Sequence, residues 1–327
     1  MTRGRVRRIL TGVGCVLLLL FTAAWWFLGV RRVALPDPDG TLITESLSWE
    51  SRPRTFQVYR PARPMTSPPI VFVLHGSAGD AAAARMLTAG EFERLADQEG
   101  FLVVYPEGFE SHWNGCRAAG PYAANQLDVD DVGFFRAIVA RLVQEDNADP
   151  AAVFATGISN GGHMAIRLAL EAPDLVQAVA PIVASLPTDD NFDCEDKGVG
   201  IAFLLINGTE DPMNPYRGGD VALYGIAGNR GGVHSTPATI EIFAARAGYE
   251  GAPVVSKLPD VDPDDGSTIV QHRWAQPGRP EVTLLAVDGG GHSMPHPVQR
   301  LPRLIGPTNA DINAPEVIWE FFARNRR

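Results

Sequence analysis

A glycine-framed serine is the feature that most constrains what this chain can fold into. Residues 157–161 read Gly-Ile-Ser-Asn-Gly and follow the apolar run 152–155. The residues after the serine have helical composition, so the chain is predicted to pass from a buried strand directly into a helix at Ser159. Glycine on either side removes the Cβ atoms that would collide as the strand and the helix close up. The turn therefore predicts a strained serine with its hydroxyl above a sheet, close to a helix N-terminus that favours negative charge.

Strands and helices alternate along most of the chain. Strands are expected at 55–60, 70–74, 101–105, 152–155, 178–183, 201–206, 268–274 and 282–287, and helices at 81–98, 131–144, 160–171, 237–247 and 314–324. This alternation predicts a mostly parallel central sheet with helices on both faces. A strand, Gly-x-Ser-x-Gly and a helix in that order form the nucleophile elbow of α/β-hydrolases. We therefore predict the α/β-hydrolase fold, without a large lid domain.

Three segments are expected along the 327 residues. They are an N-terminal membrane anchor or signal segment at 1–32, a tether at 33–50 and an α/β-hydrolase catalytic domain at 51–327. The uncharged run 9–30 would span roughly 33 Å as a helix, enough for a bilayer core of ~30 Å. More arginines precede this run than follow it, which favours a cytoplasmic N-terminus and an exported body. A cleaved signal, which would leave a secreted protein, stays open.

Charge and cysteine content narrow the function classes. The net charge of −10, with most arginine clusters at the two chain ends, argues against a nucleic-acid partner. Cys15 lies inside the apolar run, whereas Cys116 and Cys194 lie in the part expected to be exported. In an oxidising compartment these two cysteines would pair, although two separate buried thiols stay possible.

The residues that follow the predicted strands supply a catalytic constellation. Function in open α/β sheets gathers beyond the carboxyl ends of the strands. Asp211 follows the strand at 201–206 and His292 follows the strand at 282–287, so Ser159, Asp211 and His292 occur in the order that α/β-hydrolases use. We expect His292 to deprotonate Ser159 and Asp211 to orient His292. Glu210 and Asp288 are the alternative acids, and His296 is the alternative histidine.

An oxyanion hole should complete the site. One donor is expected to be the backbone N–H of Asn160, directly after the nucleophile. The other should come from the loop after Leu74, where Ser77 is our choice and Gly76 keeps the loop slim. Each donor would lower the barrier by ~3 kcal/mol.

With these residues in place, the chain resembles the exported polyhydroxybutyrate depolymerase and feruloyl esterase group of α/β-hydrolases. The matching stretches are Leu74–Gly76, Trp113–Cys116, Asp130–Phe134, Gly157–Gly162, Asn207–Pro212, Gly289–His292 and Gly306–Ala314. The resemblance implies a secreted or surface serine esterase that needs no metal or organic cofactor. It also supports the Ser159, Asp211 and His292 triad and a Cys116–Cys194 bridge. Asn207 stands where the group usually has histidine, and Met294 replaces a frequent aromatic residue, so substrate preference stays open.

The predicted function is hydrolysis of carboxylic esters through an acyl-enzyme. The expected substrates are polyhydroxyalkanoate, feruloyl or related acyl esters outside the cytoplasm. Two other functions stay open: a cell-envelope acyltransferase, which the anchor favours, and a catalytically inactive hydrolase-fold module that binds surfaces. The intact order of serine, acid and histidine argues against the inactive module.

Overall fold

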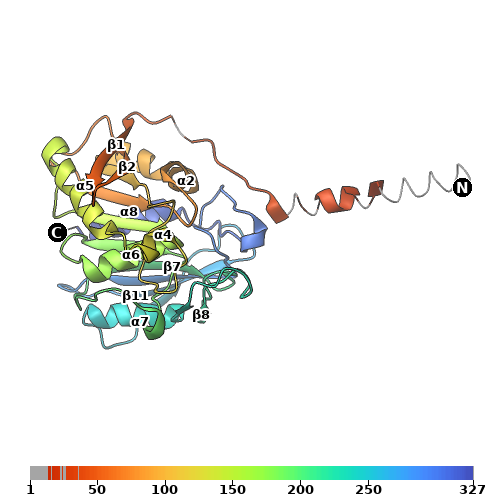
Figure 1. The fold of residues 1–327 in the computed structure, drawn as a ribbon. Helices are drawn as coiled ribbons and strands as arrows, with labels where there is room; N and C mark the ends of the chain where they lie inside the picture. Colours follow the sequence, from red (N-terminus) through yellow and green to blue (C-terminus); the bar gives the residue numbers. More distant parts are fainter. Residues whose placement is uncertain (1–13, 16, 23, 25–26, 36, 327) are drawn as a thin grey trace, which may run out of the picture.

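A ten-stranded sheet runs through the body of the protein in the order β1-β2-β4-β3-β5-β6-β7-β12-β11-β10 (Figure 1). The computed structural model describes residues 14–15, 17–22, 24, 27–35 and 37–326. The central strands are parallel: β4 (Leu102–Pro106), β3 (Ile70–Leu74), β5 (Val153–Ile158), β6 (Ala178–Ile182), β7 (Ala202–Gly208) and β12 (Val282–Asp288). Antiparallel strands flank them: β1 (Thr41–Trp49) and β2 (Arg52–Arg60) at one edge, β11 (Thr268–Trp274) and β10 (Val254–Lys257) at the other. The predicted, mostly parallel sheet is confirmed.

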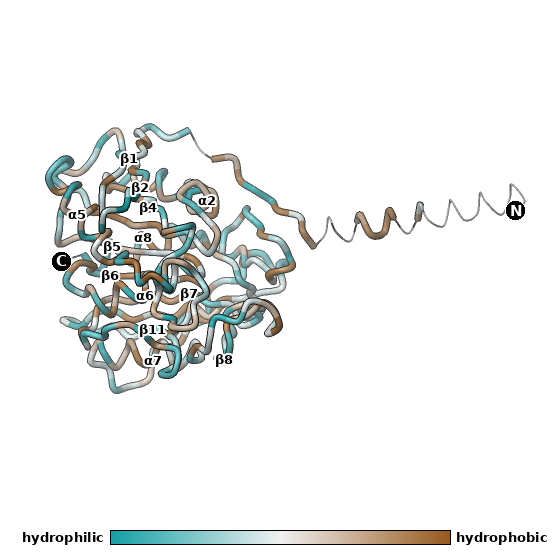
Figure 2. The backbone as a smooth tube through the Cα atoms, viewed as in Figure 1, coloured by the Kyte–Doolittle hydropathy of each residue, from teal (hydrophilic) through white to brown (hydrophobic). Residues whose placement is uncertain are grey.

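Helices cover both faces of this sheet and explain why its central strands are apolar throughout. One face packs against α5 (Asp131–Asp146), α6 (Asn160–Glu171) and α7 (Thr236–Arg246). The other packs against α2 (Ala81–Leu87), α3 (Glu91–Glu99) and α8 (Ala314–Arg324). Figure 2 shows hydrophobic residues concentrated along the strands between these two layers. Strands that are covered on both sides need no polar face, so their composition is continuous rather than alternating.

Small elements occupy the loops around the sheet. They are α4 (Ala123–Gln126), the two-stranded β8 (Gly219–Asp220) and β9 (Gly232–Val233), and 3₁₀ turns at Asp189–Asn191 and Arg303–Ile305. Most of them lie near the carboxyl edge of the parallel strands, where the catalytic residues are predicted.

Two local predictions are wrong. The helix expected at 81–98 is two helices, because Ala89 and Gly90 adopt left-handed backbone with φ of 54° and 68°. Residues 41–49, assigned to the tether, form β1 and pair with β2 in antiparallel register. Strand β1 is an edge strand that exposes many of its side chains, so its composition looks like that of a polar linker.

The N-terminal segment leads away from the body (Figure 1). Its connection to the body includes a backbone bridge between Arg31 and Arg300. The predicted anchor at 9–30 lies partly outside the described residues. Within the described part of the chain, no helix combines the length and the apolar composition that crossing a membrane requires.

Candidate active site

Ser159 occupies a sharp turn between β5 and α6. Its backbone has φ of 55° and ψ of −116°, a strained conformation for a residue with a Cβ atom. The Ser159 N–H donates to the carbonyl of Ile182 on the neighbouring strand at 2.9 Å, which holds the turn in place. A Cβ atom on Gly157 would lie 2.6 Å from the backbone of Gly161, and one on Gly161 would lie 2.5 Å from the carbonyl of Leu74. The crowding explains the small residues on both sides of the serine.

The side chain of Asn160 fastens the first turn of α6 to a neighbouring loop. Its Oδ1 accepts from the N–H of Trp113 at 2.8 Å, and its Nδ2 donates to the Trp113 carbonyl at 3.2 Å. The side chain is buried, so these bonds are shielded from water. They fix the residue whose backbone N–H is predicted to bind the oxyanion.

His292 and Asp211 form a buried pair. The Nδ1 atom of His292 lies 2.7 Å from Oδ2 of Asp211. The other carboxylate oxygen of Asp211 accepts from the backbone N–H groups of Met213 at 2.7 Å and Asn214 at 2.9 Å. With the carboxylate ionised, Nδ1 is the donor and Nε2 is left free to take a proton. The geometry is that of a histidine oriented for general-base work.

Glycines bring the loops of His292 and Asp211 into direct backbone contact. A Cβ atom on Gly208, at the end of β7, would lie 2.3 Å from the carbonyl of Gly290. A Cβ atom on Gly291 would lie 2.4 Å from the Cα of Gly306. The N–H of His292 donates to the carbonyl of Ile305 at 2.7 Å, so the 3₁₀ turn at Arg303–Ile305 fixes the histidine loop. Only glycine permits this close approach.

Ser159 and His292 line one small pocket together with Ser77. Within the described part of the chain, the Ser159 hydroxyl makes no hydrogen bond, including to His292, as is common in ligand-free sites where the bond tightens on binding. The structure thus brings Ser159, His292 and the predicted oxyanion loop to one place at the carboxyl edge of the sheet.

The oxyanion loop after β3 is held by a neutral histidine. The Nδ1–H of His75 donates to the carbonyl of Gly76 at 2.8 Å, while its Nε2 accepts from the N–H of Gly108 at 3.0 Å. Burial lowers the pKa of His75, which agrees with these roles in a neutral ring. A Cβ atom on Gly76 would lie 3.6 Å from the Cβ of Ser159, so this loop runs past the nucleophile at van der Waals distance.

The two alternative acids and the alternative histidine lie outside the pocket of Ser159. Glu210 is exposed, and among the described residues its one hydrogen bond is from its backbone N–H to the carbonyl of Gly290. Asp288 is exposed and accepts from the hydroxyl of Thr209 at 3.2 Å. His296 is buried, with Nδ1 accepting from two backbone N–H groups of its own loop. None of these three residues lines the pocket of Ser159.

Several residues that line the pocket belong to no motif that would have assigned them to the site from the sequence. The pocket is also lined by Arg117, Tyr122, His163, Val183, Met213, Asn214, Val221 and Arg230. His163 of α6 is buried and also lines the pocket. Burial lowers the pKa of His163 far below its usual value, and the charge of Arg117 adds to this effect.

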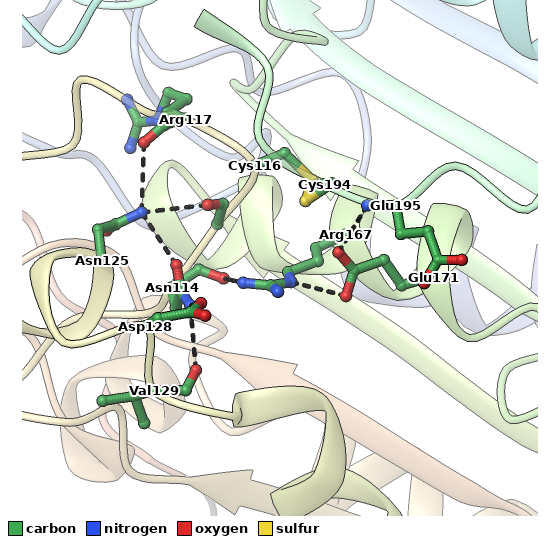
Figure 3. Close-up of a disulfide and its surroundings, with 11 residues drawn as sticks. Asn114, Cys116, Arg117, Asn125, Asp128, Val129, Arg167, Glu171, Cys194 and Glu195 are labelled. Carbon is green, nitrogen blue, oxygen red and sulfur yellow. Dashed lines mark hydrogen bonds and ion pairs between the residues drawn. A yellow bond between two sulfur atoms is a disulfide. The ribbon is translucent and has the colours of Figure 1, made fainter.

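The Cys116–Cys194 disulfide ties the pocket loop to a distant segment (Figure 3). The loop that carries Asn114, Cys116 and Arg117 is held further by Asn125, whose Nδ2 donates to the carbonyls of Gly115 and Arg117. On the other side, Arg167 of α6 donates to the carbonyl of Asn114 at 2.8 Å. These bonds and the covalent bridge fix where the Arg117 side chain begins.

Among the side chains that the structure describes, no group of three or more histidine, cysteine, aspartate or glutamate residues is arranged to hold a metal ion.

Comparisons with known proteins place the chain among esterases. The family model described as "Putative esterase" matches residues 48–194. "Putative esterase NocK" from Nocardia uniformis subsp. tsuyamanensis is 30% identical over 302 residues, covering 88% of this chain and 84% of that protein. "Probable feruloyl esterase C" from Aspergillus niger is 25% identical over 221 residues, covering 68% of this chain and 64% of that protein.

A solved structure supports the fold in particular. The acetyl xylan esterase from Aspergillus awamori superposes with a TM-score of 0.51 at 16% identity, covering 78% of this chain and 95% of that one. At this identity the likeness concerns the fold alone. Together with the sheet order and the helices on both faces, it confirms the predicted α/β-hydrolase fold.

Proposed function

We propose a serine acyl-enzyme mechanism for this chain, which belongs to the esterase family and is a carboxylic ester hydrolase. Ser159 attacks the ester carbonyl while Nε2 of His292 takes its proton, and Asp211 stabilises the imidazolium that forms. The oxyanion accepts hydrogen bonds from the N–H groups of Asn160 and Ser77. His292 then protonates the leaving alcohol and afterwards activates the water that releases the acid.

One observation carries this proposal: the buried 2.7 Å bond between His292 and Asp211, in a site whose pocket also contains Ser159. A carboxylate whose second oxygen is already bound by two backbone N–H groups has little freedom to rotate. It can therefore hold the imidazole ring in one tautomer through the whole reaction. The strained backbone of Ser159 supports the same function, since strain of this kind clusters at active sites.

The direct test is hydrolysis of p-nitrophenyl acetate. Ser159→Ala should lower kcat by about 10⁴-fold or more, and Asp211→Asn by about 10⁴-fold, because the histidine loses its orientation. Ser256→Ala on the exposed strand β10 and Asp288→Asn are the matched controls and should keep full activity. Full activity in Ser159→Ala, or a larger loss in Asp288→Asn than in Asp211→Asn, would reject the assignment.

The substrate class is proposed from the names of the relatives and from the sequence resemblance. Acyl esters of the feruloyl, acetyl or polyhydroxyalkanoate type are the substrates we propose. A panel of p-nitrophenyl acetate, methyl ferulate, acetylated xylan and polyhydroxybutyrate, assayed on the chain lacking residues 1–32, ranks these classes by kcat/KM. Cleavage of p-nitrophenyl acetate with none of the other three would exclude this proposal.

Export to the outer face of the cytoplasmic membrane is the proposed location, with residues 9–30 as the anchor, or secretion if this segment is cleaved. The Cys116–Cys194 disulfide supports export, because disulfides persist in oxidising compartments. Fractionation of cells that express the full chain should place the protein in the membrane or the medium, and removal of residues 1–32 should leave it in the cytoplasm.

A further inference from the structure

The pocket beside Ser159 contains two arginines and no carboxylate. Arg117 is only 3% exposed, and Arg230 is half-buried. Of the residues that line the pocket in the described chain, none is an aspartate or a glutamate. Asp211 lies close by, but His292 and two backbone N–H groups occupy it. The pocket therefore holds two positive charges, and no carboxylate among the described residues forms an ion pair with either of them.

A buried guanidinium without an anion is unfavourable. Arginine stays protonated in proteins, so it cannot relieve the cost of burial by losing its proton. Burial lowers the pKa of Arg117, and the charge of Arg230 adds to the effect, whereas the phenol of Tyr122 opposes it. Two cations that line one small pocket form a site that an anion would stabilise.

Tyr122 links the arginines to the predicted oxyanion loop. The Nε–H of Arg230 donates to the Tyr122 oxygen at 2.6 Å, and the Ser77 hydroxyl lies 2.9 Å from the same oxygen. Since a guanidinium can only donate, the proton of the Tyr122 hydroxyl is free to point at Ser77. An anion bound by Arg230 would therefore be connected through the Tyr122 hydroxyl to Ser77, the predicted oxyanion donor.

Two further pocket atoms lack partners. Asn214 and His163 line the same pocket and are both almost fully buried. The Oδ1 atom of Asn214 and the Nδ1 atom of His163 make no hydrogen bond in the described part of the chain. Buried polar atoms are normally paired, so these two point to a polar ligand. The Nδ1 atom of His163 can donate to a carboxylate in the tautomer that carries its proton there, whereas Oδ1 of Asn214 accepts and calls for a donor on the ligand.

We propose that this pocket binds a carboxylate group of the substrate through Arg117 and Arg230, so that the enzyme prefers esters carrying a negative charge near the scissile bond. The inference rests on the proposed esterase function of the same site. The pocket has a volume of only about 10 Å³, room for about one water molecule. A carboxylate can enter only if the exposed loop of Arg230 moves outward; at present the guanidinium is bonded to Gly228 of that same loop and to Tyr122.

Two matched pairs of esters test the proposal. On the alcohol side, 4-acetoxybenzoate is compared with neutral 4-acetoxybenzamide. On the acyl side, phenyl hydrogen adipate is compared with methyl phenyl adipate. The measured quantity is the ratio of kcat/KM for the charged ester to that for its neutral partner. Forming this ratio within each variant cancels general effects on folding and on the catalytic residues.

Arg117→Gln and Arg230→Gln should each lower this ratio by about 10- to 100-fold for at least one pair, the usual effect of losing a charge-assisted hydrogen bond. The loss should be mainly in KM of the charged ester. Arg63→Gln, on an exposed loop, removes the same charge away from the pocket and should leave the ratio unchanged. If Arg117→Gln does not fold, Arg230→Gln carries the test alone.

An unchanged ratio in Arg230→Gln for both pairs overturns the proposal. An equal loss for charged and neutral esters overturns it as well, because it would assign the arginines to the reacting centre rather than to a substrate charge. Failure of the esterase function itself is a separate result: the wild-type protein would then cleave neither neutral ester.

Discussion

Two buried arginines differ in how their charges are balanced. Arg54 on β2 donates to Asp131 at 2.6 Å, with both side chains almost fully buried, and its guanidinium lies 4.2 Å from the ring centre of Phe134. Arg117 is equally buried, yet it has no carboxylate partner among the described residues. Asn114, three residues before Arg117, donates its backbone N–H to the same Asp131. The loop that carries Arg117 is therefore in contact with the Arg54–Asp131 ion pair as well.

We interpret the paired arginine, Arg54, as a structural residue and the unpaired arginine, Arg117, as a ligand-binding residue. A cation whose counter-ion belongs to the protein fixes β2 against the start of α5 and offers nothing to a ligand. A cation without a counter-ion adds little to stability, because burying it is unfavourable, but it is available to an incoming anion. Four measurements test whether the two arginines differ in this way.

The largest effect is expected from Asp131→Asn. It leaves the Arg54 charge buried and uncompensated, which should lower the free energy of unfolding by about 3–5 kcal/mol. Arg117→Gln removes a charge that has no partner, so it should change the free energy of unfolding by less than about 1 kcal/mol or raise it. Urea unfolding measures both variants. Similar losses of stability in Asp131→Asn and Arg117→Gln would contradict the proposed difference between Arg54 and Arg117.

Removal of the disulfide comes next. The double variant Cys116→Ser, Cys194→Ser should lose about 2–4 kcal/mol in the free energy of unfolding. Because Arg117 adjoins Cys116, the variant should also lower the ratio of charged to neutral ester turnover. Thermal unfolding and the two ester pairs give the readouts. A loss of stability with the ratio intact would mean that the bridge does not position Arg117.

Acidification should destabilise the protein through its buried histidines. Burial lowers the pKa of His75, His163 and His296 below the usual value near 6.5, so the unfolded state binds more protons as the pH falls through that value. Each one should remove up to about 1.4 kcal/mol of stability per pH unit below pH 6.5. His163, next to the uncompensated Arg117, should contribute strongly.

This is checked by unfolding at a series of pH values between 7.5 and 4.5. His163→Gln should flatten the loss of stability toward low pH, and His272→Gln on the outer strand β11 is the matched control. Identical pH profiles for the wild type and His163→Gln would remove the predicted role of this histidine.

The smallest effect is expected at the surface. Arg136 and Asp174 form an exposed ion pair at 2.7 Å. Arg136→Gln should change the free energy of unfolding by only about 0.2–1 kcal/mol, and the change should vanish in high salt because solvent and ions screen exposed charges. A loss in the free energy of unfolding as large as that of Asp131→Asn would show that burial does not determine how much an ion pair contributes to stability.

The sequence predicts the framework of the site well for a physical reason. Strand–helix alternation and the turn at Ser159 are local patterns, and the acid and histidine follow strands that must end at one edge. Strand β1 is not predictable in the same way, because its exposed residues become a strand only through pairing with β2.

The charge environment depends on contacts that no local pattern encodes. Asp130 and Asp131 are neighbouring aspartates at the start of α5, and the same residue type at adjacent positions gives no sign of different roles. In the structure, Asp130 caps α5 by accepting from Gly133 at 2.7 Å, whereas Asp131 neutralises Arg54, far away in the chain. Arg117 and Arg230 likewise come together only in the folded protein, so a substrate charge cannot be inferred before the fold is known.

Covalent labelling by a fluorophosphonate tests the central claim most directly. The reagent reacts with a serine that a neighbouring histidine activates, and mass spectrometry of the digested protein locates the modified residue. We predict a single modified peptide that carries the label on Ser159, and no label in Ser159→Ala. A label on another serine, or equal labelling of Ser159→Ala, would contradict the account.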